Sequence, residues 1–216
     1  MNGAVITARN EKDTIGELVK QLRVQGLEVC VIDDGSTDGT DWAAMIEGAK
    51  VIPHKKSQGI GKSLMEAWEY ALHQDWKYIV QIDAGGSHNP KDYTWHKFTQ
   101  DVSIGSRFCK DGIYSGRRWR YYASRIVASL LNFATHQKIT DWTSGYRVFS
   151  RKALFTLMNC NYMTNMHTWQ IEVLHEAIRK GLTIAEFPIT YIAGDSSLKW
   201  KTIDDLIKVY LWILHV

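Results

Sequence analysis

Proline and cysteine are scarce in this 216-residue chain, which contains three of each. With so little proline, no segment reads as an extended linker between domains. The cysteines, Cys30, Cys109 and Cys160, are odd in number and lack the spacing of metal ligands, so they give no sign of a zinc site or a disulfide framework. No segment reaches the ~18 apolar residues of a membrane span, and no signal-peptide pattern precedes the first apolar run. We therefore expect a cytoplasmic protein.

The chain also has only a small excess of positive over negative charge. The formal net charge is +3, the pI is near 8.6, and 45% of the residues are hydrophobic. This balance does not by itself indicate a nucleic-acid or membrane partner, so local basic clusters carry more information. Length and composition predict one compact domain, residues 1–216, with a sizeable core.

Short apolar runs alternate along the chain with segments whose apolar residues have helical spacing. Strands are predicted at residues 4–8, 27–32, 49–52, 78–83, 102–107 and 182–191. Helices are predicted at residues 14–25, 41–48, 63–74, 150–158, 167–180 and 203–216, with a further basic, aromatic helix that includes 119–131. This order predicts an α/β fold with a mostly parallel, doubly wound sheet flanked by helices.

One predicted strand ends at Asp83 and is followed by Gly85 and Gly86. Ligands collect at the carboxyl ends of strands in open α/β sheets, and carboxylate oxygens suit Mg²⁺ or Mn²⁺. The stretch therefore indicates a place for a metal ion and a diphosphate. Taken alone, it is equally consistent with a strand that ends in an ordinary Asp/Gly turn.

Further charged residues follow other predicted strands. Asp33 and Asp34 come directly after the second strand and can accept hydrogen bonds from a base or ribose, although turn or N-cap roles are the alternative. Lys62 lies in a glycine-containing basic loop, and Arg107 ends a later strand with a planar group suited to phosphate.

Six motifs in order resemble the family-two glycosyltransferases with a GT-A-type fold, and most of all polyprenyl-phosphate sugar synthases such as dolichyl-phosphate mannose synthase. The resemblance covers nearly the whole chain. The matching segments are residues 5–11, the Asp-Asp-Gly-Ser-Thr-Asp-Gly-Thr run at 33–40, Gly59 to Lys62, Gly-Ser-Arg at 105–107, Asp-Trp-Thr-Ser-Gly-Tyr-Arg at 141–147, and Glu-Phe-Pro-Ile-Thr-Tyr at 186–191.

This resemblance implies an inverting, nucleotide-sugar-dependent glycosyltransferase that uses a UDP- or GDP-linked sugar and Mg²⁺ or Mn²⁺. Residues 1–107 would form the nucleotide-sugar-binding half and residues 108–216 the acceptor-binding half. The expected donor-binding residues are Thr7, Ala8, Arg9, Glu11, Asp33, Asp34, Lys62, Asp83, Ala84, Gly85 and Arg107. The expected metal ligands are Asp83 and Ser87, with His88 as a further candidate, because the second aspartate of the family's Asp-x-Asp pattern is Gly85 here.

The acceptor implied by the resemblance is a polyprenyl phosphate, reached by peripheral contact with the cytoplasmic face of a membrane. The residues expected to bind it are Arg117, Arg118, Arg120, Arg125, Trp142 and Ser144. Asp83 and Asp141 are the expected catalytic residues, with Asp141 as the base if the acceptor is a hydroxyl. The basic, aromatic stretch from Arg117 to Phe133 supports a lipid interface. The alternatives are a solvated helix face, a core position for Trp142 and a turn-capping role for Asp141.

Two other functions fit the same residues. One keeps the donor chemistry but uses a modified nucleic-acid base, a glycan or a protein hydroxyl as acceptor, since arginines and aromatics also contact phosphates and bases. The other is a non-catalytic nucleotide-sugar-binding subunit, because the second metal-site aspartate is missing. The oligomeric state is not predicted.

Overall fold

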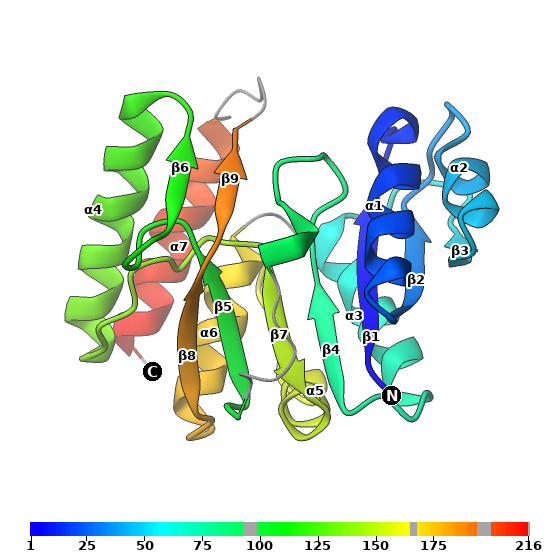
Figure 1. Ribbon diagram of the computed structural model, residues 1–216. Coiled ribbons are helices and arrows are strands. Elements are labelled where there is room, and N and C mark those ends of the chain that lie inside the picture. The colour runs from blue at the N-terminus through cyan, green and yellow to red at the C-terminus, as the bar shows by residue number, and fades with distance from the viewer. Residues whose placement is uncertain (93–98, 165–167, 194–199, 216) are drawn as a thin grey trace.

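The computed structural model describes residues 1–92, 99–164, 168–193 and 200–215 (Figure 1). Within them, seven strands form one sheet in the order β3-β2-β1-β4-β7-β5-β8. Their bounds are β1 Gly3–Ala8, β2 Glu28–Asp33, β3 Lys50–Pro53, β4 Tyr78–Gln81, β5 Val102–Ser106, β7 Arg147–Ser150 and β8 Ile184–Pro188. A second, two-stranded sheet pairs β6 (Ile113–Ser115) with β9 (Thr190–Ile192). The predicted α/β class is confirmed.

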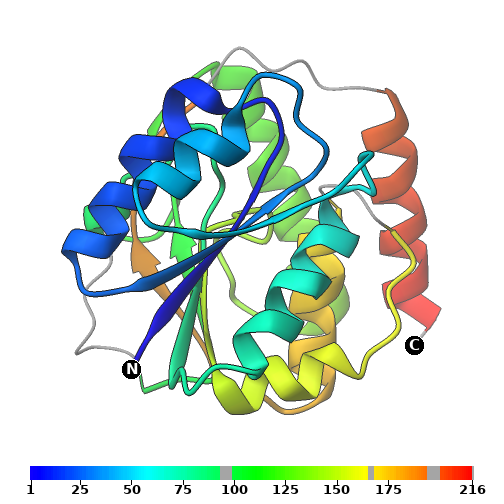
Figure 2. The ribbon, with the colours of Figure 1, turned by 90° about the vertical axis from the view of Figure 1, so that its right-hand side faces the viewer.

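Helices cover both faces of the large sheet, as Figure 2 shows. Their bounds are α1 Lys12–Val24, α2 Thr40–Ile46, α3 Ile60–Leu72, α4 Arg118–Thr135, α5 Arg151–Met158, α6 Trp169–Arg179 and α7 Trp200–His215. The 3₁₀ turn η1, Pro90–Asp92, follows β4. The apolar stripe of α1 packs on one face of the sheet, and those of α3, α5 and α6 contribute to the core on the other. Burial of such aliphatic side chains stabilises the fold by about 1.5–3 kcal/mol each.

Several strands differ from the sequence prediction, and the three-residue β6 was not predicted. The predicted strand at 182–191 is divided into β8 and β9, and the break comes directly after Pro188, which has no backbone N–H to donate. Strand β7 was not predicted; it is four residues long and runs antiparallel to both β4 and β5. The predicted helices at 167–180 and 203–216 correspond to α6 and α7, but His167 and Val216 lie outside the described residues.

Candidate active site

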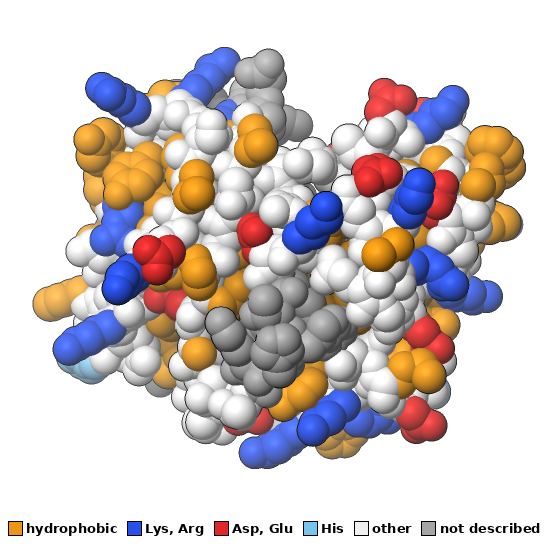
Figure 3. Space-filling model, in the orientation of Figure 1, with side chains coloured by type: hydrophobic (Ala, Val, Ile, Leu, Met, Phe, Trp, Pro, Cys, Tyr) orange, Lys and Arg blue, Asp and Glu red, His pale blue; other side chains and the backbone are white. Residues whose placement is uncertain are grey.

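Four charged residues lie along one edge of the sheet. Strand β2 is parallel to β1 and β1 to β4, and β5 has the same direction as β4 because both are antiparallel to β7. The carboxyl ends of β2, β4 and β5 therefore carry Asp34, Asp83 and Arg107 to the upper edge in Figure 1. The segment that contains Asp141 reaches the same edge because it leads into the oppositely directed β7. Figure 3 shows that the surface is notched there, between the α1/α2 side and the β6/β9 side.

Asp34 holds the loop that leads into α3. Its carboxylate accepts hydrogen bonds from Ser57 Oγ at 2.6 Å, Gln58 N at 2.7 Å and Gly59 N at 3.1 Å, and it contacts His54 Nδ1 at 2.9 Å. Burial disfavours ionisation of this carboxyl, but the hydrogen bonds outweigh burial and hold its pKa at about 2. Asp34 is therefore an ionised support for the loop.

Asp33 is bonded to its own turn. Its carboxylate accepts hydrogen bonds from the backbone N–H of Ser36, at 3.1 Å, and from the Ser36 hydroxyl. Its carbonyl oxygen accepts from His54 N at 2.8 Å. The structure thus shows that Asp33 and Asp34 position loops, and the nucleotide contacts predicted for them stay predictions.

Glu11 lies where the loop after β1 meets the loop after β4. Its backbone N–H donates to Thr40 Oγ1 at 2.8 Å, and its carboxylate accepts from the Thr14 hydroxyl at 3.2 Å. The position that a Cβ would take at Gly85 is 3.5 Å from Glu11 Oε1. Glu11 is thus held beside the segment that follows Asp83.

Asp83 presents a partly exposed carboxylate, with 45% of the side chain accessible. Its Oδ2 is 3.2 Å from Nε2 of His88, a side chain that is only 1% exposed and whose Nδ1 has no hydrogen-bond partner among the described residues. The carboxylate also lies against Gly145, where a Cβ would be 2.4 Å from Oδ2. Only glycine at that position leaves Asp83 where it is.

Arg107 and Asp141 form a buried ion pair. Nε and Nη2 of Arg107 donate to the two carboxylate oxygens, each at 2.7 Å, and the Arg107 backbone N–H donates at 3.1 Å. The guanidinium also donates to Thr143 Oγ1 at 2.6 Å and lies over the rings of Phe108 and Tyr191. This planar, two-bond geometry is the arrangement in which arginine binds a carboxylate most strongly.

The pairing bears on the roles predicted for both residues. Asp141 is 1% exposed; burial alone would raise its pKa, but the hydrogen bonds and charge of Arg107 hold that pKa below its ordinary value. Conversely, Asp141 raises the pKa of Arg107 against the effect of burial. In this conformation each charge neutralises the other, so a base at Asp141 or a phosphate at Arg107 requires the pair to open. The two roles stay predictions.

Glu186, on β8, is a supporting residue to which the sequence analysis gave no role. Its carboxylate accepts from the backbone N–H and hydroxyl of Thr140 and, at 3.0 Å, from the backbone N–H of Asp141. It therefore fixes the start of the Asp141 segment from another strand. Its place in the Glu-Phe-Pro motif was the one signal of this role in the sequence.

Arg147, at the start of β7, was noted in the sequence only as the end of a motif. It is fully buried; its Nε donates to the Ser144 carbonyl and its Nη2 to the Trp142 carbonyl, each at 3.1 Å, while Nη1 has no partner among the described residues. Burial lowers its pKa to about 10, against the opposing influence of Asp141 and Asp83. A buried cation thus lies beneath the loop that contains both Asp141, the partner of Arg107, and Gly145, the neighbour of Asp83.

Trp142 and Ser144 do not face an acceptor in this structure. Trp142 is 1% exposed, packs in the core and donates from Nε1 to Asn132 Oδ1 at 2.9 Å. Ser144 is 2% exposed and accepts from the Tyr146 N–H. For Trp142 the core alternative therefore holds, and the prediction that its ring meets the acceptor is corrected: a ring enclosed by protein has no face left for stacking.

The four arginines predicted to bind the acceptor lie at or on α4, and Arg125 is joined to the residue before Asp141. Arg125 donates to the Thr140 carbonyl at 3.3 Å and lies over Phe108. Arg120 lies over the Trp119 ring in its own helix. The other two, Arg117 and Arg118, are exposed where the helix begins.

Helix α4 also exposes an apolar stripe, which we call the α4 stripe. Its members lie three or four residues apart and are 46–78% exposed: Trp119, Tyr122, Ile126, Leu130 and Phe133. Side chains on the other side of the helix, such as Leu131, enter the core. In the part of the chain that the structure describes, no helix is long and apolar enough to cross a membrane.

The other predicted site residues also lie at or near the sheet edge. Thr7 and Ala8 end β1, Lys62 lies in the first turn of α3, and Ala84 is buried after β4. Arg9 is exposed, and the carbonyl oxygen of Ser87 accepts from Ile192 N at 2.9 Å. The donor contacts predicted for Thr7, Ala8, Arg9, Lys62 and Ala84, and the metal contact predicted for Ser87, stay predictions.

The acidic residues at the sheet edge fit a hard divalent cation that shares its coordination with phosphates. Among the described residues no group of three or more His, Cys, Asp or Glu side chains is placed to hold a metal. Asp83 is partly exposed, however, and the carboxylate of Glu11 lies beside position 85. Mg²⁺ commonly binds through one or two carboxylates and completes its shell with phosphates and water.

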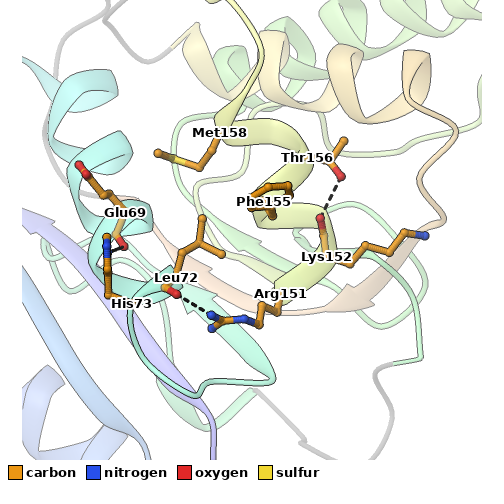
Figure 4. Close-up of a pocket in the computed structure, with 8 residues that line it drawn as sticks. All are labelled: Glu69, Leu72, His73, Arg151, Lys152, Phe155, Thr156 and Met158. Atoms are coloured by element: carbon orange, nitrogen blue, oxygen red, sulfur yellow. Dashed lines mark hydrogen bonds between the residues drawn. The ribbon is translucent and has the colours of Figure 1, made fainter.

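A surface groove elsewhere on the molecule is not part of this site. It has a volume of about 650 Å³ and lies between α3 and α5, where Phe155 and Met158 line it (Figure 4). Arg151 donates there to the Leu72 carbonyl, and its own N–H bonds to Lys77 just before β4. The groove thus lies at the opposite end of β4 from Asp83.

The fold is that of the GT-A glycosyltransferases, a class of enzymes that transfer glycosyl groups. The chain belongs to glycosyl transferase family 2, whose family model matches residues 4–157. The predicted family is confirmed.

Individual relatives agree with this assignment. The polyprenol monophosphomannose synthase of Mycolicibacterium smegmatis is 27% identical, over 96% of this chain and 85% of its own. The undecaprenyl-phosphate mannosyltransferase of Micrococcus luteus is 25% identical, over 96% of this chain and 92% of its own. A structure of glucosyl-3-phosphoglycerate synthase from Mycobacterium tuberculosis with Mn²⁺, UDP and glucosyl-3-phosphoglycerate shares the fold, with a TM-score of 0.72, 19% identity and coverage of 99% and 78%.

Proposed function

We propose that this glycosyltransferase moves a sugar from a UDP- or GDP-linked donor to a polyprenyl phosphate, with inversion, at a membrane surface. The donor lies at the sheet edge against Asp83, with Glu11 and the loops held by Asp33 and Asp34 around it. Mg²⁺ or Mn²⁺ at Asp83 would neutralise the diphosphate leaving group. The names of the two similar mannosyltransferases support a lipid phosphate acceptor.

The observation that carries the acceptor assignment is the ion pair of Asp141. Transfer to a hydroxyl group requires a base, and the residue predicted for that role is enclosed and neutralised by Arg107. A phosphate oxygen is already ionised near neutral pH and needs no base to accept the sugar. The paired state of Asp141 therefore favours a phosphate acceptor over a hydroxyl.

The α4 stripe supports the lipid part of the assignment. Its apolar side chains are exposed along a helix that begins with arginines, and basic residues beside aromatic and aliphatic ones favour an interfacial position on anionic lipid. Arg125 connects this helix to Thr140, next to Asp141. A lipid lying along α4 would present its phosphate close to the sheet edge. Figure 3 shows hydrophobic and basic side chains side by side over this part of the molecule.

The activity is tested by incubating the protein with UDP- and GDP-linked sugars, Mn²⁺ or Mg²⁺, and undecaprenyl phosphate in detergent or vesicles. We expect a glycolipid product with undecaprenyl phosphate and none with undecaprenol, which has the same chain but no phosphate. Product with 3-phosphoglycerate and none with lipid would place the acceptor among soluble phosphates. Nucleotide binding without transfer to any acceptor would favour the non-catalytic subunit.

The membrane contact is tested separately, by flotation with vesicles that contain anionic lipid. The double variant Ile126→Ser, Phe133→Ser should lose binding, since each side chain contributes apolar area to the interface. Trp42→Ser is the matched control, because Trp42 is 64% exposed and belongs to α2, which lies on the opposite side of the molecule from α4 in Figure 1. Equal binding by both variants would contradict a role for the α4 stripe.

A further inference from the structure

A carboxylate from another part of the chain lies in contact with the position of the missing metal-site aspartate. A Cβ built on Gly85 would lie 3.5 Å from Oε1 and 3.7 Å from Oε2 of Glu11. These are ordinary contact distances, so a methyl group fits, but a longer acidic side chain would meet the Glu11 carboxylate. Two carboxylates in one place repel each other unless a cation lies between them.

The backbone gives no other reason for glycine at this position. Gly86 has a φ of +68°, in the region that favours glycine, whereas Gly85 is not among the residues with positive φ. An aspartate at Gly85 is therefore compatible with the main chain. Its carboxylate would, however, lie close to that of Glu11.

From this geometry we infer that Glu11 supplies the second carboxylate of the metal site, in place of the side chain absent at Gly85. The inference rests on the proposed function, because the cation it concerns is the one that accompanies the donor diphosphate. The two protein carboxylates would then come from different loops, Asp83 after β4 and Glu11 after β1. Their relative position is fixed by the hydrogen bonds of Glu11 to Thr40 and Thr14 and by the contact of Asp83 with Gly145.

Two carboxylates do not complete the coordination shell of Mn²⁺ or Mg²⁺. The diphosphate and water supply the remaining oxygens, as is usual for Mg²⁺ sites with substrate phosphates. Metal and nucleotide should therefore bind together, each strengthening the other by the same factor. A protein with a preformed metal cage would bind Mn²⁺ strongly without nucleotide.

The test measures Mn²⁺ binding directly, by the loss of the free Mn²⁺ signal in electron paramagnetic resonance, with UDP or GDP present. Glu11→Gln should weaken Mn²⁺ binding at least about tenfold, because loss of even an outer-shell partner has effects of this size. Its affinity for nucleotide should fall more with Mn²⁺ present than in EDTA, because metal and nucleotide binding are linked. Glu17→Gln is the matched control, because Glu17 is exposed on α1, the helix that follows Glu11, and accepts a hydrogen bond from Gln21.

A rescue variant separates metal binding from other roles of Glu11. Glu11→Gln combined with Gly85→Asp adds a carboxylate from the other loop beside that of the lost one, so Mn²⁺ binding should recover at least in part. Wild-type Mn²⁺ affinity in Glu11→Gln would overturn the inference and leave the proposed function intact. So would an equal loss of nucleotide affinity with and without metal, since Glu11 would then bind the nucleotide itself. A wild-type protein that binds neither nucleotide under any condition would contradict the proposed function as well.

Discussion

Replacement of Asp141 by asparagine tests whether the buried ion pair supports the site. The substitution keeps the shape and one oxygen acceptor but leaves the Arg107 guanidinium, whose side chain is 11% exposed, without its counter-ion. Removal of one member of a buried pair typically destabilises a protein by about 3–5 kcal/mol, because the other charge remains desolvated. We expect a loss of this size, equal to roughly 6–20 °C in Tm at about 2–4 °C per kcal/mol for a chain of this length.

The assay is chemical denaturation followed by circular dichroism, with the slope compared between variants to exclude changes in cooperativity. Asp204→Asn is the matched control, because Asp204 and Lys208 form an ion pair in which both side chains are about 60% exposed. Such exposed pairs contribute about 0–1 kcal/mol. Adding Arg107→Met to Asp141→Asn removes the stranded charge and should restore at least half of the lost stability. A loss below about 1 kcal/mol in Asp141→Asn, or no recovery in the double variant, would refute the reasoning.

Two further predictions concern the neighbouring contacts. Gly145→Ala should reduce glycosyl transfer strongly while the protein stays folded, because the new methyl group would displace the Asp83 carboxylate; a wild-type rate in a transfer assay would contradict this. His54 lies between Asp34 Oδ1 at 2.9 Å and Glu66 Oε2 at 2.6 Å, and although burial acts to lower its pKa, these carboxylates raise it above the ordinary value of 6.5. This pairing stabilises the fold at pH values below the pKa of His54 in the unfolded chain, and the stabilisation is lost as the pH rises through the pKa of His54 in the folded protein. The substitution His54→Gln should therefore lower the free energy of unfolding more at about pH 6 than at about pH 8.5. Equal losses at both pH values in denaturant titrations would show that the pairing is not titrating.

The parts of the fold that could be predicted are those that local pattern determines. Alternating apolar runs and helical periodicity placed β1, β2, β4 and the helices between them, because each buries one continuous face. Once the strands were parallel, Asp34, Asp83 and Arg107 had to share an edge, and they do. Strand β7 was not predicted because it contains only two apolar residues, between the charged Arg147 and Ser150.

The partners of the site residues could not be predicted, because they are fixed by tertiary structure. Glu186 is 45 residues from Asp141 in the chain, and nothing local indicates that its carboxylate holds the Asp141 N–H. The helix period likewise identified the apolar residues of α4 but not which of them face outward. Leu131 meets the core, whereas Phe133 is 78% exposed, and only the packing of the helix on the domain decides between them.

The segment from Thr140 to Arg147 connects the two sides of the proposed reaction. Its Gly145 contacts Asp83 on the donor side. Its Asp141 binds Arg107, which lies over the Phe108 ring, and Arg125 of α4 lies over the same ring. Glu186 holds one end of the segment and the guanidinium of Arg147 holds the other through backbone carbonyls. Because these supports act on one short piece of backbone, a displacement that opens the ion pair should also shift the glycine that positions Asp83. Variants on the two sides should therefore be non-additive in transfer rate, as expected for residues that share a rigid support.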